Sequence, residues 1–223
     1  MKLHFVIAEA ALELVPKPLW GDPSVRSDSK RRGLEPGGIL LDRSIHHSAM
    51  LRLKDGYRRG RPDLVQLTLL SVTSTPLHQS GTARVYIHTL DDVVLEFAEA
   101  VRPPKSYARF RSLVEKTLAE MPEGGLVRAR EATLQQLLEE IGTDYSVGLS
   151  VQGSPRPLDS LAAELCAKRA PSVIVGGFPR GHFLPSDLKV FDALARIDDK
   201  PLDAHVVAAR MVYEVEKNLK KTG

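Results

Sequence analysis

A run of β-branched residues that leads straight into a glycine-rich loop constrains the fold more than any other feature. Residues 173–175 read Val-Ile-Val, typical of a short buried strand, and residues 176–181 read Gly-Gly-Phe-Pro-Arg-Gly. Glycine lets a ligand approach the backbone, and open α/β sheets bind ligands beyond the carboxyl ends of their strands. The alternative is a tight turn between two core elements. The spacing matches neither the dinucleotide fingerprint nor a P-loop, so we expect a ligand other than a pyrophosphate.

Strands and helices alternate along the rest of the chain, which predicts an α/β fold with a largely parallel sheet. Further strands are expected at 3–8, 64–70, 147–151 and 194–197, and helices at 42–55, 106–121, 134–141, 162–165, 188–191 and 207–215. Alternation over 82–98, interrupted by Asp91 and Asp92, predicts a β-hairpin with an acidic turn. Residues 16–40 are rich in proline, glycine and basic residues, and are expected to form a surface loop with a basic centre.

The composition narrows the class of protein. A chain of 223 residues suits a single domain spanning 1–223. Its net charge is +3 and its sequence pI is about 9.0, which suits a polyanionic partner where basic residues cluster. Cys166 is the only cysteine, which excludes an intramolecular disulfide and a cysteine zinc site, and predicts a small core thiol. Because neither a membrane span nor a signal peptide is recognisable, we expect a soluble, cytoplasmic protein.

A first cluster of basic residues precedes the apolar run at 64–70. Arg58, Arg59 and Arg61 are unfavourable to crowd together unless an anion neutralises them, although a solvated run of charge is the common alternative. Asp63 follows Arg61 across a rigid proline. A carboxylate there is placed to hold one guanidinium in a chosen orientation by a charge-assisted pair.

A second cluster of basic residues surrounds the start of the helix predicted from Ser106. Arg102 and Lys105 lie before that start, and Arg109 lies in the first turn. Cations at this position oppose the helix dipole, whereas free amides flanked by cations suit a phosphate group. We therefore expect phosphate binding here rather than an ordinary surface.

Together these stretches resemble the small-subunit rRNA pseudouridine N1-methyltransferases of ribosome biogenesis, a SPOUT-class family, in its archaeal type. The matching stretches, in family order, are residues 57–63, 86–89, 102–110 and 175–181, and the resemblance runs from about residue 42 to the end of the chain. It implies an α/β fold with a C-terminal trefoil knot, a mostly parallel sheet and an inserted β-hairpin. It also implies a homodimer, S-adenosylmethionine as cofactor, no metal, and 16S rRNA of the pre-ribosomal small subunit as substrate.

The resemblance also implies site residues. For the cofactor they are Leu149, Gly176, Gly181, Ile197, Asp198, Asp199, Lys200, Pro201 and Leu202. For the rRNA they are Arg61, Arg102, Lys105 and Arg109, with Asp63 holding Arg61 in place. Lys105 stands at a position where the family typically has arginine. Lysine contacts a phosphate as a point charge, whereas arginine can donate two hydrogen bonds to it. Residues 21–38 have no counterpart that aligns.

This chemistry fits a chain without an evident metal or nucleophile cluster, because methyl transfer from a sulfonium can be accelerated largely by positioning. The N1 proton of pseudouridine must leave, but no residue is identified as the general base. Asp63 is the nearest candidate, and its pairing with Arg61 favours a structural role. Two alternatives stay open: an RNA-binding assembly factor with weak or dispensable transferase activity, and a related enzyme that methylates a uridine or a guanosine.

Overall fold

The chain forms one mixed sheet with helices on both faces. The computed structural model describes residues 1–99 and 101–222, in which the seven-stranded sheet has the order β4-β3-β2-β1-β6-β5-β7. The strands are β1 (Leu3–Ala10), β2 (Ala83–Thr89), β3 (Val93–Phe97), β4 (Val127–Glu131), β5 (Tyr145–Pro155), β6 (Pro171–Gly176) and β7 (Ala193–Arg196). The pairs β1–β2, β1–β6, β5–β6 and β5–β7 are parallel, whereas β2–β3 and β3–β4 are antiparallel. The predicted α/β class with a mostly parallel sheet is confirmed.

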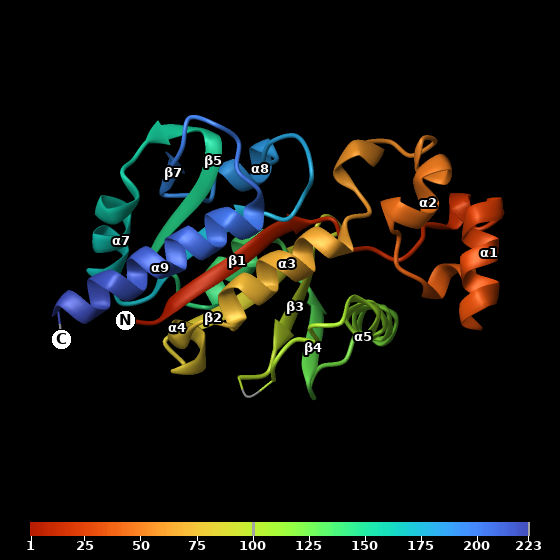
Figure 1. Cartoon of the computed structure of the whole chain (residues 1–223), viewed down its shortest axis with the longest axis horizontal. Coiled ribbons are helices and arrows are strands. Elements are labelled where there is room, and N and C mark those ends of the chain that lie inside the picture. The colour runs from red at the N-terminus through yellow and green to blue at the C-terminus, as the bar shows by residue number, and fades with distance from the viewer. Residues whose placement is uncertain (100, 223) are drawn as a thin grey trace.

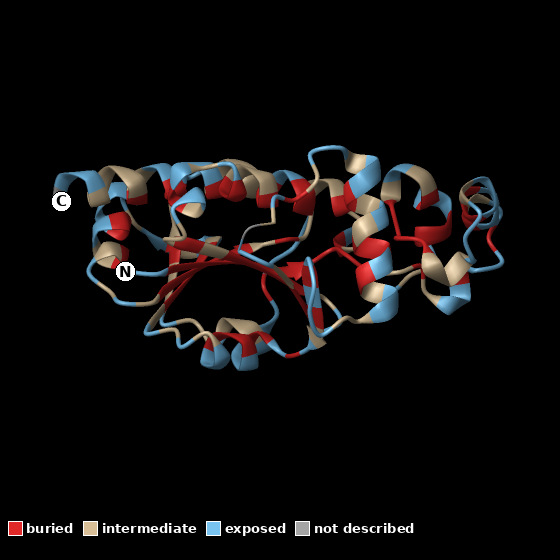
Figure 2. Cartoon of the chain, turned by 90° about the horizontal axis from the view of Figure 1, so that it is seen from below, coloured by how far each residue is buried: buried red, intermediate tan, exposed pale blue. Residues whose placement is uncertain are grey.

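Helices cover the two faces of this sheet and extend it at one end. The α-helices are α1 (Pro23–Arg32), α2 (Arg43–Met50), α3 (Pro62–Thr73), α4 (Pro76–Gln79), α5 (Tyr107–Glu120), α6 (Leu134–Glu140), α7 (Leu158–Cys166), α8 (Pro185–Leu188) and α9 (Ala204–Thr222). Short 3-10 turns lie at η1 (Lys17–Leu19), η2 (Pro36–Gly38) and η3 (Gly56–Arg58). Figure 1 shows α3 and α9 packed across one face, with α1 and α2 beyond the edge of the sheet. Figure 2 shows the buried strands between helical layers.

Strand β1 divides the core because successive side chains of a strand point to opposite faces. All its residues are buried, as expected for a central strand covered on both sides. Leu3, Phe5 and Ile7 join the main core with side chains of α3, α5, α7 and α9. Val6 and Ala8 face the other way and pack in a smaller core with α6 and residues around α8. A third, separate cluster lies between η1, α1 and α2.

The strand predicted at 64–70 is wrong, because these residues lie in helix α3. Pro62 occupies the start of the helix and Asp63 lies in the first turn, both favourable there. Val65, Leu69 and Val72 are buried on one helical face. A short apolar run does not by itself separate a buried strand from a buried helix, so the run of leucines was misassigned.

The surface loop predicted at 16–40 is wrong over residues 23–32, which form helix α1. The Asp22 side chain caps the helix by accepting a 3.0 Å hydrogen bond from the Ser24 amide, Pro23 begins it, and Gly33 ends it with a φ of 65°. Val25 is the buried hydrophobic side chain of α1. With so little apolar periodicity, only the capping residues mark this helix in the sequence.

The remaining predictions differ from the structure mainly at element ends. The hairpin predicted over 82–98 is β2–β3, although β2 pairs with β1 and is therefore part of the central sheet rather than an insertion. The helix expected at 188–191 lies earlier, as α8, because Pro185 starts it. Strand β4 and the short helix α4 were not predicted. Cys166 is partly buried against the main core, as expected for a core thiol.

Within the described residues, no helix combines the length and the apolar character needed to cross a membrane.

Candidate functional site

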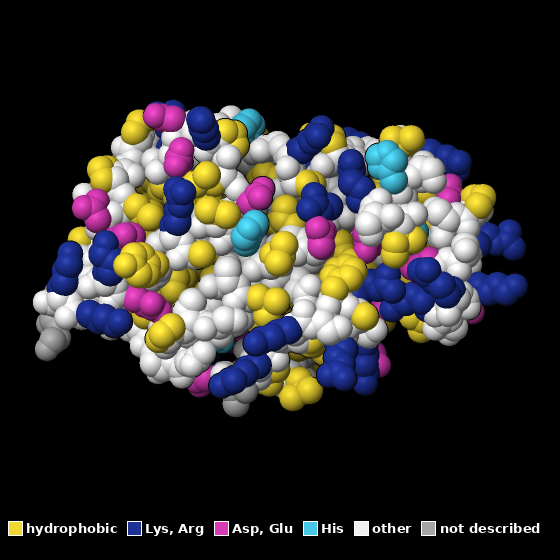
Figure 3. All heavy atoms as spheres, viewed as in Figure 1, with side chains coloured by type: hydrophobic (Ala, Val, Ile, Leu, Met, Phe, Trp, Pro, Cys, Tyr) yellow, Lys and Arg dark blue, Asp and Glu magenta, His cyan; other side chains and the backbone are white. Residues whose placement is uncertain are grey.

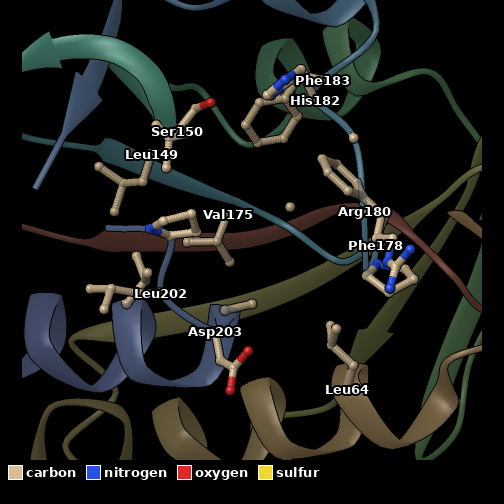
Figure 4. Close-up of a pocket in the computed structure, with 17 residues that line it drawn as sticks. Leu64, Leu149, Ser150, Val175, Phe178, Arg180, His182, Phe183, Leu202 and Asp203 are labelled. Carbon is tan, nitrogen blue, oxygen red and sulfur yellow. The ribbon is translucent and has the colours of Figure 1, made fainter. Parts of the chain in front are cut away.

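A main cavity of about 200 Å³ lies at the carboxyl ends of β5 and β6, beside the start of α9. It is lined by Leu64, Leu149, Ser150, Val151, Val175, Gly176, Phe178, Pro179, Arg180, Gly181, His182, Phe183, Pro201, Leu202, Asp203, Ala204 and Val207. A side cavity of about 70 Å³ adjoins it and is lined by Leu149, Ser150, Val151, Arg196, Ile197, Asp198, Lys200, Leu202 and Val207. Figure 4 shows Leu149 and Ser150 across the main cavity from Phe178 and Arg180, with Leu64 and Asp203 on the side of α3.

The residues predicted for the cofactor converge here, because β5, β6 and β7 are parallel and their carboxyl ends meet at one edge of the sheet. Leu149, Gly176, Gly181, Pro201 and Leu202 line the main cavity, and Leu149, Ile197, Asp198, Lys200 and Leu202 line the side cavity. Asp199 lines neither. Its carboxylate is 92% exposed and lies 3.5 Å from a guanidinium nitrogen of Arg196.

The glycines of residues 176–181 allow the loop to turn close to β1 and to line the main cavity. The Gly177 amide donates to the Ala8 carbonyl at 2.7 Å, and the Ala11 amide donates to the Gly177 carbonyl at 2.9 Å. A Cβ on Gly177 would lie 2.7 Å from the Cα of Ala10, and a Cβ on Gly176 would lie 2.7 Å from the Phe178 ring. Gly181 has a φ of 97°, which strongly favours glycine. The loop therefore needs glycine to pass so close to β1 while it lines the cavity.

Several lining residues were missed by the sequence reasoning. Leu64 was assigned to a strand, so its place beside the cavity was not foreseen. Asp203 directly follows the predicted loop 197–202 and Val207 lies in the first turn of the helix after it, and this proximity in sequence was the signal that could have found them. Phe178 and Phe183 were not singled out, because their ring-to-ring contact at 5.6 Å depends on how the loop folds back.

The crowded arginines before α3 are each matched by a carboxylate of the protein. Arg58 pairs with Glu9, Arg59 with Glu13, and Arg61 with Asp63. The expectation that this cluster needs an external anion is therefore wrong for Arg58 and Arg59. Both carboxylates that neutralise them come from the end of β1 and the segment after it, a pairing that sequence spacing does not reveal.

The contact predicted between Arg61 and Asp63 is present. The Arg61 guanidinium donates two hydrogen bonds to the Asp63 carboxylate, Nε to Oδ1 at 2.8 Å and Nη2 to Oδ2 at 2.9 Å. Although partial burial acts in the opposite direction, the bonds from Arg61 hold the pKa of Asp63 below its usual value. Asp63, with smaller contributions from Asp203 and Asp42, raises the pKa of Arg61. Leu64, the residue after Asp63, and Asp203 both line the main cavity. The Arg61–Asp63 pair therefore lies beside this cavity.

The start of α5 is tied to the starts of α2 and α3. The Gln66 side chain donates to the carbonyls of Pro104 and Lys105, at 2.8 and 3.1 Å. The Tyr107 hydroxyl donates to Asp42, which caps α2. Burial and this hydrogen bond raise the pKa of the Tyr107 phenol. These contacts bring the second basic cluster next to the helix that carries Asp63.

The cations of this second cluster face solvent. Arg102, Lys105 and Arg109 are exposed, and none of them forms an ion pair with a carboxylate of the described residues. Ser106 precedes α5 without a side-chain cap, and the first turn of α5 carries no acidic residue within the described chain. Figure 3 shows Lys and Arg side chains gathered where α5 lies beside α1 and α2. This helix start thus offers free amides and cations together.

No group of three or more His, Cys, Asp or Glu residues suited to a metal ion occurs among residues 1–99 and 101–222.

Comparisons with known proteins identify the family of this chain. A model of the family described as EMG1/NEP1 methyltransferase matches residues 5–216. A relative from Pyrobaculum neutrophilum, named ribosomal RNA small subunit methyltransferase Nep1, is 42% identical over 216 residues, which cover 95% of this chain and 96% of the relative. The protein of the same name from Aeropyrum pernix is 37% identical over 221 residues, 96% of this chain and 97% of that one.

A solved structure extends the likeness to three dimensions. The crystal structure of Archaeoglobus fulgidus Nep1 bound to S-adenosylhomocysteine superposes with a TM-score of 0.87 and 30% sequence identity, covering 99% of this chain and 100% of that one. The SPOUT-type α/β fold implied by the sequence resemblance is thereby confirmed. The chain belongs to the EMG1/NEP1 methyltransferase family.

Proposed function

We propose that this chain is an S-adenosylmethionine-dependent rRNA methyltransferase that acts in ribosome biogenesis and methylates N1 of a pseudouridine in 16S rRNA. The observation that carries the proposal is the position of the loop-lined cavity beside the Arg61–Asp63 pair, at the start of helix α3, whose Gln66 side chain contacts the segment that begins α5. The names of the relatives and the S-adenosylhomocysteine bound by the A. fulgidus structure support it. We expect the enzyme to work in the cytoplasm, together with its rRNA.

The lining of the cavities suits this cofactor. Leu149, Leu202 and Val207 form an apolar surface shared by both cavities, which fits an adenine ring. The backbone of the glycine loop and of loop 197–202 supplies hydrogen-bonding groups for the ribose and the methionine tail. Arg180 and Asp203 add one charge of each sign at the main cavity, matching the carboxylate and the ammonium of that tail.

Positioning is the contribution we assign to the protein. S-adenosylmethionine supplies an activated methyl group when bound, so the protein has to hold the acceptor nitrogen in line with that methyl. The Arg61–Asp63 pair lies beside the main cavity and presents a guanidinium in a fixed orientation. Nη1 of Arg61 takes no part in the two hydrogen bonds to Asp63, and in this proposal it contacts the RNA backbone. No residue is assigned as the proton acceptor.

The rRNA is bound, in this proposal, by Arg61, Arg102, Lys105 and Arg109. The exposed cations at the uncapped start of α5 act on phosphates through charge and backbone amides. Asp63 acts indirectly, by holding Arg61. A homodimer would present two such surfaces to one folded RNA element, and sedimentation at micromolar concentration tests it: an active monomer would contradict the dimer.

The experiment that tests the function separates binding from chemistry. Cofactor affinity, RNA affinity and methyl incorporation from labelled S-adenosylmethionine are measured on the same preparation, with 16S rRNA as substrate. The proposal predicts cofactor binding and stoichiometric incorporation. RNA binding with negligible methyl transfer would favour the alternative of an assembly factor whose transferase activity is dispensable.

A further inference from the structure

Loop 177–184, which begins in the glycine-rich stretch and ends before α8, adjoins two cavities. Residues 178–183 line the main cavity, and Leu184 lines a rear cavity of about 230 Å³. The rear cavity is lined by Glu9, His88, Thr89, Leu90, Asp92, Thr133, Gln135, Leu184, Ser186, Asp187 and Val190. Phe183 packs edge-to-face against Phe178 of the same loop and against Phe191, and Gly177 is held by backbone hydrogen bonds with Ala8 and Ala11. Because residues 178–183 border one cavity and Leu184 borders the other, the loop is not fully surrounded by packed side chains, and polar contacts contribute to holding its shape.

Arg58 contacts the loop at two places on either side of Gly181. Its Nη1 donates to the His182 carbonyl at 2.7 Å, and its guanidinium carbon lies 4.3 Å from the centre of the Phe178 ring. A planar guanidinium makes both contacts at once, through a hydrogen bond at its edge and a cation–π contact at its face. The residue is only 8% exposed. Arg58 therefore faces the protein interior and is unavailable to RNA.

Glu9 holds the loop from the other end and also holds Arg58. Its carboxylate accepts a 2.7 Å hydrogen bond from the Leu184 amide and pairs with the Arg58 guanidinium. Glu9 is 1% exposed and has a φ of 49°, in a region that residues with a Cβ rarely adopt. It lies at an irregularity of β1, between Ile7 and Ala10. Backbone outliers of this kind persist where the surroundings hold them, commonly at functional sites.

We propose that Glu9 and Arg58 are positioning residues for cofactor binding, which together hold loop 177–184 in the shape that forms one wall of the main cavity. The inference rests on the proposed function, because it assumes that the main cavity takes S-adenosylmethionine. The two residues touch three points of the loop, at Phe178, His182 and Leu184. Neither residue lines the main cavity, so both act through the loop.

The charge of Glu9 responds to pH in the neutral range. Burial raises the pKa of Glu9 to about 7, against the opposing effects of the Leu184 amide and Arg58, and Asp187 raises it further. The other titratable neighbour is His88, whose Nδ1 faces the Glu9 amide at 3.4 Å and whose Nε2 lies 2.9 Å from Asp92. Protonation of Glu9 removes the charge opposite Arg58. Cofactor affinity should therefore weaken as the pH falls from 8 to 6, and Glu9→Gln should abolish this dependence.

A matched control is available one residue along the chain. Arg59 and Glu13 form a second ion pair with little exposure, from the same two segments as Arg58 and Glu9, and their hydrogen bonds run to each other and not to the loop. The double variants Glu9→Gln/Arg58→Met and Glu13→Gln/Arg59→Met each remove one such pair without leaving an isolated buried charge. Their dissociation constants for S-adenosylhomocysteine are measured by calorimetry, next to their thermal unfolding temperatures.

The first double variant should bind S-adenosylhomocysteine about tenfold more weakly if the loop keeps its binding shape about a tenth of the time. The control variant should bind as the wild type does. Arg58→Lys keeps a charge beside Glu9 but loses the planar fork, so its affinity should be intermediate. Unchanged affinity in Glu9→Gln/Arg58→Met, or equal weakening in both double variants, would overturn the proposal.

Hydrogen exchange in the absence of ligand tests the same pair independently of the proposed function. The Leu184 amide donates to Glu9, so its exchange should accelerate in Glu9→Gln/Arg58→Met and stay unchanged in the control. If the wild type bound neither S-adenosylmethionine nor S-adenosylhomocysteine, the proposed function would fail, while the exchange result would still decide whether the pair holds the loop. Unchanged exchange at Leu184 would refute that role.

Discussion

Asp63 accepts both hydrogen bonds that the guanidinium edge of Arg61 offers it, at 2.8 and 2.9 Å, and thereby fixes the orientation of the most exposed arginine of its cluster, beside the main cavity. The side chains of Arg61 and Asp63 are 36% and 46% exposed. An ion pair with this exposure contributes little to stability, about 0–1 kcal/mol. This small contribution to stability supports the role in RNA binding that we propose for the pair.

Replacing either partner of this pair should weaken RNA binding in different ways. Arg61→Ala removes a phosphate contact, so affinity should fall and the slope of log affinity against log salt should flatten by about one unit. Asp63→Ala leaves the charge but frees its orientation, so affinity should fall while the slope changes little. Filter binding across a salt series measures both. A wild-type affinity in Arg61→Ala would remove this residue from the RNA surface.

The cations at the start of α5 should behave as independent phosphate contacts. Arg102→Ala, Lys105→Ala and Arg109→Ala should each lower RNA affinity and flatten the salt slope by about one unit, with cofactor affinity unchanged. Lys105→Arg should strengthen binding, because a guanidinium can grip a phosphate through two hydrogen bonds. The same salt series applies. Wild-type slopes in the Arg102 and Arg109 variants would contradict the proposed surface.

Cofactor binding should depend on Gly176. A Cβ at this position would lie 2.7 Å from the Phe178 ring, so Gly176→Val should displace Phe178 from the cavity wall and reduce cofactor affinity severely. Gly124→Val is a suitable control, because a Cβ on Gly124 meets no atom within 4 Å. Calorimetric titration with S-adenosylhomocysteine compares the two. Normal affinity in Gly176→Val would exclude the glycine loop from the site.

The stability of the fold should depend on pH through His4. This residue is 3% exposed on β1 and stacks on Tyr86, with ring centres 5.8 Å apart. Burial, with smaller contributions from the charges of Lys2 and Arg84, lowers the pKa of His4 to about 4. In the unfolded chain His4 takes up a proton near pH 6.5, whereas in the folded chain it stays neutral down to about pH 4. The free energy of unfolding is therefore highest above pH 6.5 and decreases as the pH falls from 6.5 towards 4.

Between pH 7 and pH 4 the free energy of unfolding should fall by about 2–3 kcal/mol more in the wild type than in His4→Phe, which keeps an aromatic ring and cannot titrate. Urea unfolding at a series of pH values measures this difference. Parallel pH profiles for the two proteins would show that folding does not lower the pKa of His4, and would contradict this prediction.

Local signals in the sequence were sufficient for much of the fold. The β-branched run of β6 and the N-cap signals of Asp42 and Ser106 placed their elements correctly. The apolar run of α3 was ambiguous, because a buried strand and a buried helix have the same composition there. Helix α1 has too few apolar residues for a periodicity, so its capping residues were the only signal. Such elements are decided by tertiary packing rather than by local preference.

The candidate site was predictable where its residues are neighbours in the sequence, and unpredictable where it joins segments that are far apart in the sequence. The loop at 176–181 and the Arg61–Asp63 pair are contiguous in sequence and were singled out from their residues, whereas loop 197–202 was indicated by the family resemblance. The pairing of Glu9 with Arg58 joins residues 49 positions apart, and the return of Leu184 to Glu9 spans 175 positions. Sequence spacing does not predict contacts over such separations. The carboxylates that neutralise Arg58 and Arg59 are therefore recognisable only in the folded structure.

The central claim is that this chain methylates N1 of a pseudouridine, and the most direct measurement compares two RNAs that differ at one nucleotide. Fragments of 16S rRNA are prepared with either pseudouridine or uridine at the target position, incubated with labelled S-adenosylmethionine, and digested to nucleosides for mass spectrometry. We predict methyl incorporation only into the pseudouridine RNA, with the methyl on N1, although both RNAs bind equally. Equal incorporation into the uridine RNA, or methylation of another base, would contradict the claim.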